Sequence, residues 1–559
     1  MVRIPVGKEF FDAIRREQDY YVDKTEILYQ LVEEARNEVT LFTRPRRFGK
    51  TLMMSMMECF FSIQRGDSRD LFEGLDIMKH EAFCAAWMNQ YPVLFVTLKG
   101  IEALSFEEAF STLKAKLSEV CIKHKELLEN RVSTETDRMV FKKLMKKEAD
   151  LAEIKGSLGT IMRMMHDHYG KQVILLIDEY DVPLAKASER DTEENGYYQK
   201  MLDVIRGMFD AAIKTNEFLK FAVITGCLRI AKESIFTGTN NFKSYSVLDE
   251  EFSECFGFTQ TEVDKLLSDA DRTDKAETIR EWYNGYVFGN TPVYCPWDVV
   301  NYVATLLKIR NAKPKNYWKN TSHNGILLTF VKRTDFDVSD KFETLMNGGT
   351  LLQTISDELT YNTLHASEEN LWSVLLMTGY LTKADPDAEG DTVELKIPNA
   401  EISNIFEETV VSHFKDTLAL DRTKQTGLME ALWSGDEEKA TRLMTDILFD
   451  TISYHDYHEN YYHAFLTGII SGLGYAVRSN QENGLGRSDI DVREKRKRRA
   501  MLLEAKKSDK AENMLKDALD GMRQIEEKEY LKGFDGFESV ICYGISFFQK
   551  KALVKKLGD

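Results

Sequence analysis

The chain has 559 residues, of which 43% are hydrophobic and 30% are charged, and its net charge at pH 7 is −17. This length is too great for one hydrophobic core and predicts roughly two to four domains, while the composition excludes an intrinsically disordered chain. The negative charge argues against a bulk electrostatic grip on nucleic acid, although it allows a local basic channel.

Residues 1–11 carry charges and contain no hydrophobic signal core, and no apolar run approaches the length of a membrane span. The seven cysteines are scattered and form no C-x-x-C pair, which favours reduced thiols and argues against a zinc ribbon. We therefore expect a cytoplasmic protein with no membrane partner.

After a lead-in with a helix pattern at residues 26–35, the segment T-L-F-T-R-P-R-R-F-G-K-T (40–51) predicts a strand, a tight basic loop and a helix that begins at Gly49. A nucleotide's phosphates bind at such a position in α/β proteins, because N–H groups at the start of the helix face the anion. Lys50 adds a mobile positive charge, and the Thr51 hydroxyl can reach Mg²⁺. The segment therefore predicts an ATP-binding loop.

This loop departs from the full spacing G-x-x-x-x-G-K-[ST], because Arg44 stands where that pattern has glycine. This difference leaves open whether the loop wraps the phosphates tightly, and hence how fast ATP is hydrolysed. Arginine side chains bind phosphate well, so Arg44, Arg46 and Arg47 are candidates for additional phosphate contacts.

Further strands are expected at residues 92–98 and 173–177, with long charged helices (106–163) between them. The run V-I-L-L-I at 173–177 is typical of a strand buried in a parallel sheet. It ends at Asp178 and Glu179, where open α/β sheets bind ligands. We assign Asp178 to Mg²⁺ and Glu179 to orienting and deprotonating the attacking water. The alternative is a strand that simply ends in solvated acids.

Another strand, at residues 218–225, ends at Thr225, and Arg229 follows closely. A polar residue at the tip of a strand beside the acidic one can sense the γ-phosphate, so both residues are nucleotide-binding candidates. For Arg229, a pair with a nearby acid is the alternative. The alternation of strands and helices predicts an α/β domain with a mainly parallel sheet over residues 1–250.

Residues 251–400 predict a helical lid followed by a winged-helix-like region. Thr259 and Glu262 form a capping-box pattern that opens a helix. The aromatic residues of W-Y-N-G-Y (282–286) and Y-C-P-W-D (294–298) are interpreted as core and interdomain packing rather than as a base-stacking platform.

A helix at residues 371–382, a turn at 385–391 and a strand at 393–397 resemble a winged helix. Such a module can contact DNA, but it also serves as a plain packing unit.

The last region, residues 401–559, is expected to hold a helix at 459–473 and strands at 475–479, 487–492 and 500–505. Side chains alternate along a strand, so Glu504 and Lys506 project from the same face. Antiparallel pairing of the last two strands would place Asp489 beside them.

Two neighbouring carboxylates can hold Mg²⁺, which lowers the pKa of a bound water, while Lys506 can position the nucleophile or stabilise charge on a phosphate. Glu459 on the preceding helix would complete the metal shell, and Gln524 on the following helix would orient water or backbone. The alternative is a surface hairpin with ordinary charges, because E-x-K is a common sequence.

The histidines at 455, 458 and 463 do not share one helical face and are interpreted as surface or core residues rather than as metal ligands. The basic run at 493–499 is interpreted as a solvated turn, with a DNA-backbone contact or a localisation signal as alternatives.

Over nearly its whole length the chain resembles the AAA-ATPase-like family. The resemblance rests on I-P-V-G-K-E-F-F (4–11), Y-V-D-K-T (21–25), R-P-R-R-F-G-K-T (44–51), L-L-I-D-E-Y-D (175–181), T-G-C-L-R-I (225–230), W-Y-N-G-Y and Y-C-P-W-D. The tail, G-R-S-D-I-D-V (486–492) with L-L-E-A-K-K (502–507), is similar to the PD-(D/E)xK nuclease domain that accompanies that ATPase, with Ser488 in the position of the proline.

The resemblance implies a P-loop ATPase domain joined to a restriction-endonuclease-like domain. Lys50 and Thr51 would then bind phosphate and Mg²⁺, and Asp178 and Glu179 would be the Walker B acids. The nuclease site would consist of Glu459, Asp489, Glu504 and Lys506, with Gln524 in support.

The first hypothesis is therefore an ATP-binding protein, an ATPase, whose nucleotide state controls an Mg²⁺-dependent domain that cleaves DNA, with RNA as the other nucleic acid. The second is a nucleotide-dependent switch whose C-terminal domain binds nucleic acid or a partner without cleaving. The third is a scaffold in which both sites have decayed.

Overall fold

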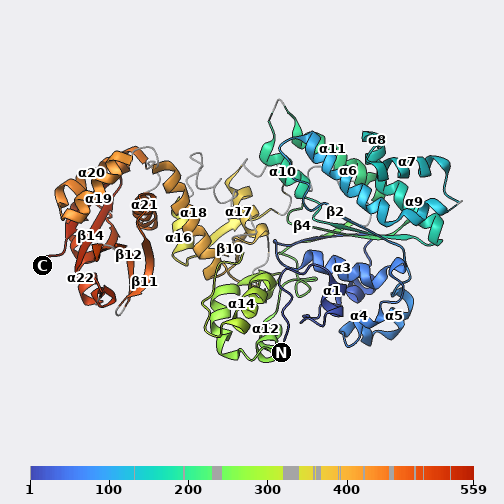
Figure 1. Ribbon diagram of the computed structural model, residues 1–559, viewed down its shortest axis with the longest axis horizontal. Helices are drawn as coiled ribbons and strands as arrows, with labels where there is room; N and C mark the ends of the chain where they lie inside the picture. Colours follow the sequence, from blue (N-terminus) through green and yellow to red (C-terminus); the bar gives the residue numbers. More distant parts are fainter. Residues whose placement is uncertain are drawn as a thin grey trace. The chain divides into compact units, whose positions relative to one another are not determined.

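The computed structural model describes residues 2–558 except 131, 193–194, 230–241, 319–338, 357–358, 360–366, 388–389, 391, 419–421, 452–458, 484–485, 495–496, 529 and 535. The chain divides into two compact units, residues 1–322 with 352–401 and residues 323–351 with 402–559. Each unit is described by itself (Figure 1). The division into domains 1–250, 251–400 and 401–559 stays a prediction.

A five-stranded sheet forms the centre of the first unit. Its neighbouring strands pair in parallel in the order β2-β3-β4-β1-β5, which confirms the predicted α/β class. The strands are β1 Val39–Thr43, β2 Val93–Thr97, β3 Val173–Asp178, β4 Leu219–Gly226 and β5 Phe242–Tyr245. Strands β1 and β3 are buried on both faces, because helices cover both sides of a parallel sheet. Strand β4 lies between them, so the ends of all three strands meet at one edge.

Helices cover both faces of this sheet (Figure 1). One face carries α1 Phe11–Arg16, α3 Lys50–Phe61, α4 Arg69–Phe72 and α5 Glu81–Trp87. The other carries α6 Phe106–Lys123, α7 Glu135–Lys146, α8 Leu151–Lys155, α9 Ser157–Tyr169, α10 Val182–Arg190 and α11 Tyr197–Ile213. The short α2 Ile27–Tyr29 continues as a π-helical turn, Gln30–Ala35. The long charged helices expected over 106–163 are confirmed as α6 to α9.

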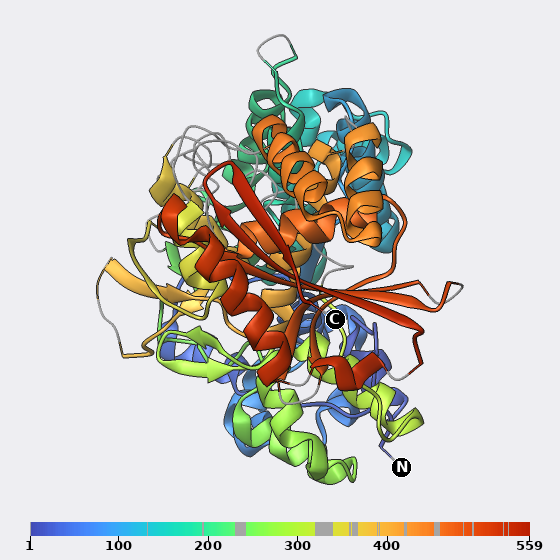
Figure 2. The same ribbon diagram turned by 90° about the vertical axis from the view of Figure 1, so that its left-hand side faces the viewer.

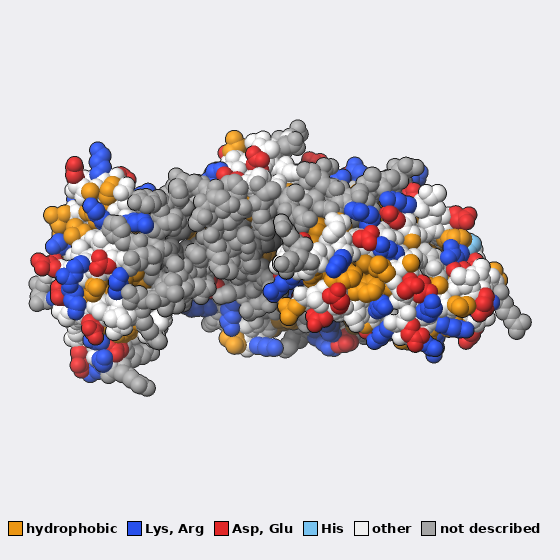
Figure 3. Space-filling view, turned by 90° about the horizontal axis from the view of Figure 1, so that it is seen from above, with side chains coloured by type: hydrophobic (Ala, Val, Ile, Leu, Met, Phe, Trp, Pro, Cys, Tyr) orange, Lys and Arg blue, Asp and Glu red, His pale blue; other side chains and the backbone are white. Residues whose placement is uncertain are grey.

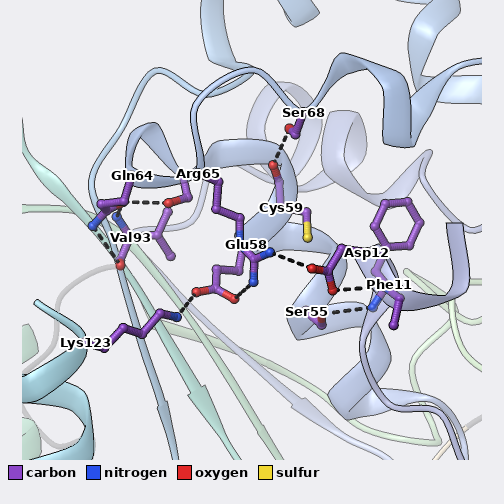
Figure 4. A network of polar contacts seen from close by, with 12 residues as sticks. Phe11, Asp12, Ser55, Glu58, Cys59, Gln64, Arg65, Ser68, Val93 and Lys123 are labelled. Carbon is purple, nitrogen blue, oxygen red and sulfur yellow. Dashed lines mark hydrogen bonds and ion pairs between the residues drawn. The ribbon is translucent and has the colours of Figure 1, made fainter. Parts of the chain in front are cut away.

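An ion-pair network fixes α3, the helix that begins at the phosphate loop (Figure 4). The Glu58 side chain is only 7% exposed, and it pairs with Arg65 at 2.7 Å and with Lys123 of α6 at 2.5 Å. Arg65 also binds Asp12 of α1 at 3.1 Å. Burial raises the pKa of Glu58, but the charges of Lys123 and Arg65 outweigh it and leave this pKa below its ordinary value of 4.5.

Replacing Glu58 with glutamine should lower the free energy of unfolding by about 3 kcal/mol at neutral pH, because the substitution breaks buried ion pairs. A depressed carboxyl pKa stabilises the fold above the ordinary pKa of 4.5, and this contribution is lost as pH falls through the folded value. Denaturant titrations should therefore show that the difference in free energy of unfolding between the variant and wild type is smaller at about pH 3 than at about pH 7. The exposed Glu119→Gln on α6 is the control; an equal loss at both pH values would contradict this account.

The region predicted to be a helical lid, called the lid below, contains α12 Gln260–Asp269, α13 Ala276–Tyr283, α14 Pro296–Lys308 and the hairpin β6 Tyr286–Phe288 with β7 Thr291–Val293. The capping box of Thr259 and Glu262 is confirmed. Tyr283, Tyr294 and Tyr302 are at most 1% exposed and lie in the apolar core of these helices, which agrees with the packing interpretation.

A helix and a hairpin follow in this unit, as the winged-helix pattern predicts. Helix α17 Glu368–Thr378 precedes β9 Thr382–Lys383 and β10 Thr392–Lys396, which pair antiparallel, and β8 Leu351–Thr354 completes the sheet in the order β8-β10-β9.

The second unit contains a mixed sheet of five strands in the order β11-β12-β13-β14-β15, in which only the pair β13–β14 is parallel. These strands are β11 Val477–Asn483, β12 Gly486–Glu494, β13 Arg499–Lys507, β14 Ser539–Phe548 and β15 Lys551–Lys556. The helices are α16 Ser339–Met346, α18 Ala400–Leu418, which begins in the first unit, α19 Arg422–Ser434, α20 Glu437–Thr451, α21 Glu459–Gly472 and α22 Met514–Glu527.

Helices α19, α20 and α21 pack on one face of this sheet, where Met501, Leu503 and Ala505 join their core. Helix α22 lies on the opposite face (Figure 2). The approach of α22 is close, since a Cβ atom at Gly544 would lie 1.9 Å from the carbonyl oxygen of Ala518. This second face is the one that carries Glu504, whose Cβ would be 3.6 Å from one built at Gly521.

None of the described helices is long and apolar enough to cross a membrane. Acidic and basic side chains are interspersed over the described surface seen in Figure 3.

Candidate functional site: a phosphate loop and a paired-carboxylate site

The loop between β1 and α3 is closed around Lys50. The Lys50 side chain is buried, and its Nζ donates hydrogen bonds to the carbonyl oxygens of Arg44 and Pro45, each at 2.9 Å. Gly49 precedes the helix with φ of 85°, in the left-handed region that favours glycine. Arg47 is also left-handed, with φ of 73°. The chain thus turns sharply at the first residues of α3, as a phosphate-binding loop requires.

Arg44 does not belong to the phosphate-facing surface of this loop. Its side chain is fully buried and donates to the carbonyl oxygens of Thr43 and Tyr245, each at 2.9 Å. Its guanidinium also lies over the rings of Phe256 and Phe288, and burial lowers its pKa to about 10. The expected phosphate contact from Arg44 is therefore wrong, because this side chain anchors the loop to β5 and the lid.

Asp178, at the end of β3, links the start of α3 with the end of β4. Its Oδ2 accepts a hydrogen bond from Thr51 Oγ1 at 2.9 Å, and its Oδ1 accepts one from Thr225 Oγ1 at 2.7 Å. Burial raises the pKa of Asp178, against the lowering effect of both hydroxyls and of the Lys50 charge. A hydroxyl and a carboxylate oxygen in contact form the oxygen-rich donor set that suits Mg²⁺.

Glu179 follows at the tip of β3 with a strained backbone. Its φ is 54°, a conformation that costs free energy for a non-glycine residue and that concentrates at active sites. Its backbone N–H donates to Thr225 Oγ1 at 3.3 Å. Burial raises the pKa of Glu179, which makes it a better base toward water than a solvated carboxylate.

The segment after β4 is fixed to the end of β3. Asp181 Oδ2 accepts hydrogen bonds from the backbone N–H groups of Cys227 and Leu228, at 2.9 and 3.1 Å. This segment leads to Arg229, which is half-buried, as is Arg46 in the loop. The structure thus brings Lys50, Thr51, Asp178, Glu179 and Thr225 to one edge of the sheet.

In the second unit, the antiparallel pairing of β12 with β13 places Asp489 beside Glu504, as the sequence predicts. Asp489 Oδ2 accepts a hydrogen bond from the Ala505 N–H at 2.9 Å, and Asp489 N–H donates to Glu504 Oε2 at 3.4 Å. Lys506 Nζ lies 3.4 Å from Glu504 Oε1. The Glu504 side chain is fully buried, so burial raises its pKa, and the nearby Asp489 charge raises it further.

Gln524 contacts Tyr530, a residue that the sequence analysis did not identify. Its Nε2 donates to the hydroxyl oxygen of Tyr530 at 3.3 Å. Burial raises the pKa of Tyr530, and the charges of Glu504 and Asp489 raise it further. A lone tyrosine in a helix-rich segment gives no sequence signal for this position.

Helix α21 brings His463 to the same site. His463 Nε2 donates to the Asp489 carbonyl oxygen at 2.8 Å, and the histidine lowers the pKa of Glu407 on α18, which burial raises. His463 is therefore a partly buried residue bonded to the backbone, which agrees with the surface-or-core interpretation, whereas His455 and His458 lie outside the described residues. Glu459 begins α21, but its side chain also lies outside the described part.

No group of three histidine, cysteine, aspartate or glutamate residues suited to a metal ion occurs among the described residues. Asp489 and Glu504, two of the three ligands expected in the nuclease site, lie side by side, and the third, Glu459, has its side chain outside the described part.

The basic run between β12 and β13 is more than a solvated turn. Arg493 pairs with the buried Asp491 at 2.7 Å, and Arg499 pairs with Glu494 at 2.6 Å while its guanidinium stacks over Trp433 at 4.0 Å. The solvated-turn interpretation is wrong for Arg493 and Arg499, which are only partly exposed and serve packing. Lys497 and Arg498 are exposed and pair with acids.

Comparisons with known proteins match the two parts of the chain that contain these residues. Residues 5–236 match the family described as predicted AAA-ATPase, and residues 457–557 match the PD-(D/E)XK nuclease superfamily. The chain therefore carries an AAA-ATPase-like domain and a PD-(D/E)XK nuclease superfamily domain. An uncharacterized protein in the vnfD 5′ region of Azotobacter chroococcum mcd 1 is 25% identical over 502 residues, which cover 88% of this chain and 87% of that protein.

Proposed function

We propose that the protein is a cytoplasmic ATPase in which ATP binding in the first unit controls an Mg²⁺-dependent DNA endonuclease in the second. The observation that carries the proposal is the contact of Asp178 with both Thr51 and Thr225 beside the loop closed on Lys50. It unites the phosphate-binding, metal-binding and phosphate-sensing positions of one nucleotide site.

In the nucleotide site, N–H groups at the start of α3 and the Lys50 ammonium bind the phosphates, with Arg46 and Arg47 as further cations. Thr51 and Asp178 would hold Mg²⁺, which would supply positive charge to neutralise the phosphates. Glu179 accepts the proton of the attacking water, and Thr225 keeps both acids in position through its single hydroxyl. Arg229 approaches from the end of β4.

In the nuclease site, Asp489 and Glu504 would hold Mg²⁺, which would supply an activated water and charge stabilisation for the leaving oxygen. Lys506 lies beside Glu504 and is placed to stabilise negative charge on the scissile phosphate. Gln524 and Tyr530 orient groups at this pair, and His463 holds the backbone of Asp489. Because Lys506 donates to the Glu504 carboxylate, replacing either of these two side chains disturbs the other.

The second candidate is a nucleotide-dependent switch that binds nucleic acid or a partner without cleaving it. Absence of cleavage of DNA and of RNA by a protein that binds ATP would support this candidate.

Replacing Lys50 with alanine tests the nucleotide site. The affinity for ATP should fall by about a hundredfold, because one charge-assisted contact to the phosphates is lost and the loop carbonyls lose their buried donor. Isothermal titration calorimetry measures this, with the exposed Lys142→Ala on α7 as the control. Equal affinity of the Lys50 variant and wild type would refute the phosphate-loop assignment.

A further inference from the structure

The phosphate loop packs against the lid through its own residues. The centre of the Phe48 ring lies 5.0 Å from that of Tyr286 and 4.9 Å from that of Phe288. Cys295 Sγ donates a weak hydrogen bond at 3.9 Å to the Arg47 carbonyl oxygen. The lid therefore fixes both the backbone at Arg47 and the side chain that follows it, at the turn before α3.

A tryptophan of the lid supports the side chain of Arg47. The Arg47 guanidinium lies 4.1 Å from the centre of the Trp297 ring, and tryptophan is the aromatic residue that attracts a cation most strongly. Trp297 lies in the first turn of α14, and its indole N–H donates to the Tyr317 carbonyl oxygen at 3.3 Å. Because the indole is itself hydrogen-bonded, it gives the guanidinium a fixed surface.

The edge of the Arg47 guanidinium is open to a ligand. Among the described residues, this guanidinium forms no ion pair and donates no hydrogen bond. Two other cations of the loop differ, because Lys50 and Arg44 each donate to backbone carbonyl oxygens. Stacking covers a face of the planar guanidinium and leaves the N–H groups at its edge available. A half-buried arginine in this state suits a ligand with several anionic oxygens, such as a phosphate.

We propose that Trp297 is a positioning residue of the nucleotide site, which holds the Arg47 guanidinium in place so that its N–H groups bind the phosphates of ATP. This role rests on the proposed nucleotide site and adds the lid to it. The stack exists before the nucleotide arrives, so binding does not have to order a long side chain. Arg47 thereby contributes more to phosphate affinity than an unsupported arginine would, and the lid takes part in recognising the phosphates.

The test is calorimetry, in Mg²⁺, of the binding of ATP and of tripolyphosphate, which has no base or sugar. Trp297→Leu should weaken the binding of both ligands about fivefold, because the arginine loses its preformed position. Trp297→Phe keeps an aromatic face and should stay within about twofold of wild type. The matched control is Trp282→Leu on α13, a partly buried tryptophan of the lid with no cation over its ring among the described residues. This control should bind both ligands as wild type does.

A double-mutant cycle separates an effect that acts through Arg47 from any other effect of the tryptophan substitution. Arg47→Leu should weaken ATP binding about tenfold. Trp297→Leu should cause no further loss of affinity when Arg47→Leu is already present, because the two side chains act as one unit.

Tryptophan fluorescence gives a second measurement, which does not require Trp297→Leu to fold. Tripolyphosphate should change the emission of wild type, because the bound phosphates neutralise the charge beside the indole. The same ligand should leave the emission of Trp297→Phe and of Arg47→Leu unchanged. A change of emission in Trp297→Phe equal to that of wild type would contradict the role of Trp297.

Wild-type affinity of Trp297→Leu for both ligands would overturn this role and leave the nucleotide site intact. A loss of ATP affinity that persists in the Arg47→Leu background, with no loss for tripolyphosphate, would overturn it as well and would place the adenine base on Trp297. Failure of wild type to bind ATP would refute the proposed function, and the role of Trp297 with it.

Discussion

A Glu504→Gln variant should lose Mg²⁺-dependent DNA cleavage, with a fall in rate of about a thousandfold. The fully buried carboxylate is the partner of both Asp489 and Lys506, so the amide removes a metal ligand and the counter-charge of the lysine together. The shape of the side chain is kept, and burial already disfavours its charge. The fold should therefore tolerate glutamine.

Cleavage of supercoiled plasmid, followed over time on agarose gels, measures this loss. The matched control is Glu512→Gln, an exposed glutamate of the same unit, which should cleave at the wild-type rate. Thermal melting of each variant separates a catalytic loss from unfolding. Cleavage by Glu504→Gln at the wild-type rate would remove the nuclease assignment.

A Glu179→Gln variant should bind ATP with close to wild-type affinity but hydrolyse it about a thousandfold more slowly. Glu179 is assigned to the attacking water, whereas Lys50 and Thr51 are proposed to bind the phosphates and the metal. Glutamine meets the same left-handed backbone as glutamate, so the loop geometry held by Thr225 should survive.

Phosphate release under saturating ATP measures the rate of hydrolysis, and calorimetry measures the affinity for ATP. The two measurements together separate a loss of catalysis from a loss of binding. Glu148→Gln, an exposed position of the same unit, is the control. An unchanged rate of hydrolysis in Glu179→Gln would assign the base to another residue, and a large loss of affinity would place Glu179 in binding instead.

Features that depend on residues close together in the sequence were predictable from the sequence alone. The loop of 40–51, the buried strand that ends at Asp178, and the capping box at Thr259 each depend on neighbours within a few residues. The pairing of Asp489 with Glu504 followed from alternation and a short hairpin. These local patterns identified most of the candidate residues of both sites.

Features that depend on distant partners were not predictable. The direction of Arg44 depends on Tyr245 and on two phenylalanines of the lid, and no periodicity reveals that an arginine at a phosphate loop turns inward. The contact of His463 with the Asp489 carbonyl required the packing of α21 on the sheet.

The central claim, that ATP in the first unit controls cleavage by the second, is tested most directly by the plasmid cleavage rate in Mg²⁺ with and without a non-hydrolysable ATP analogue. We expect the analogue to change the wild-type rate at least about fivefold, and to leave the rate of Lys50→Ala unchanged at the same analogue concentration. An identical wild-type rate in the presence and absence of the saturating analogue would contradict the account.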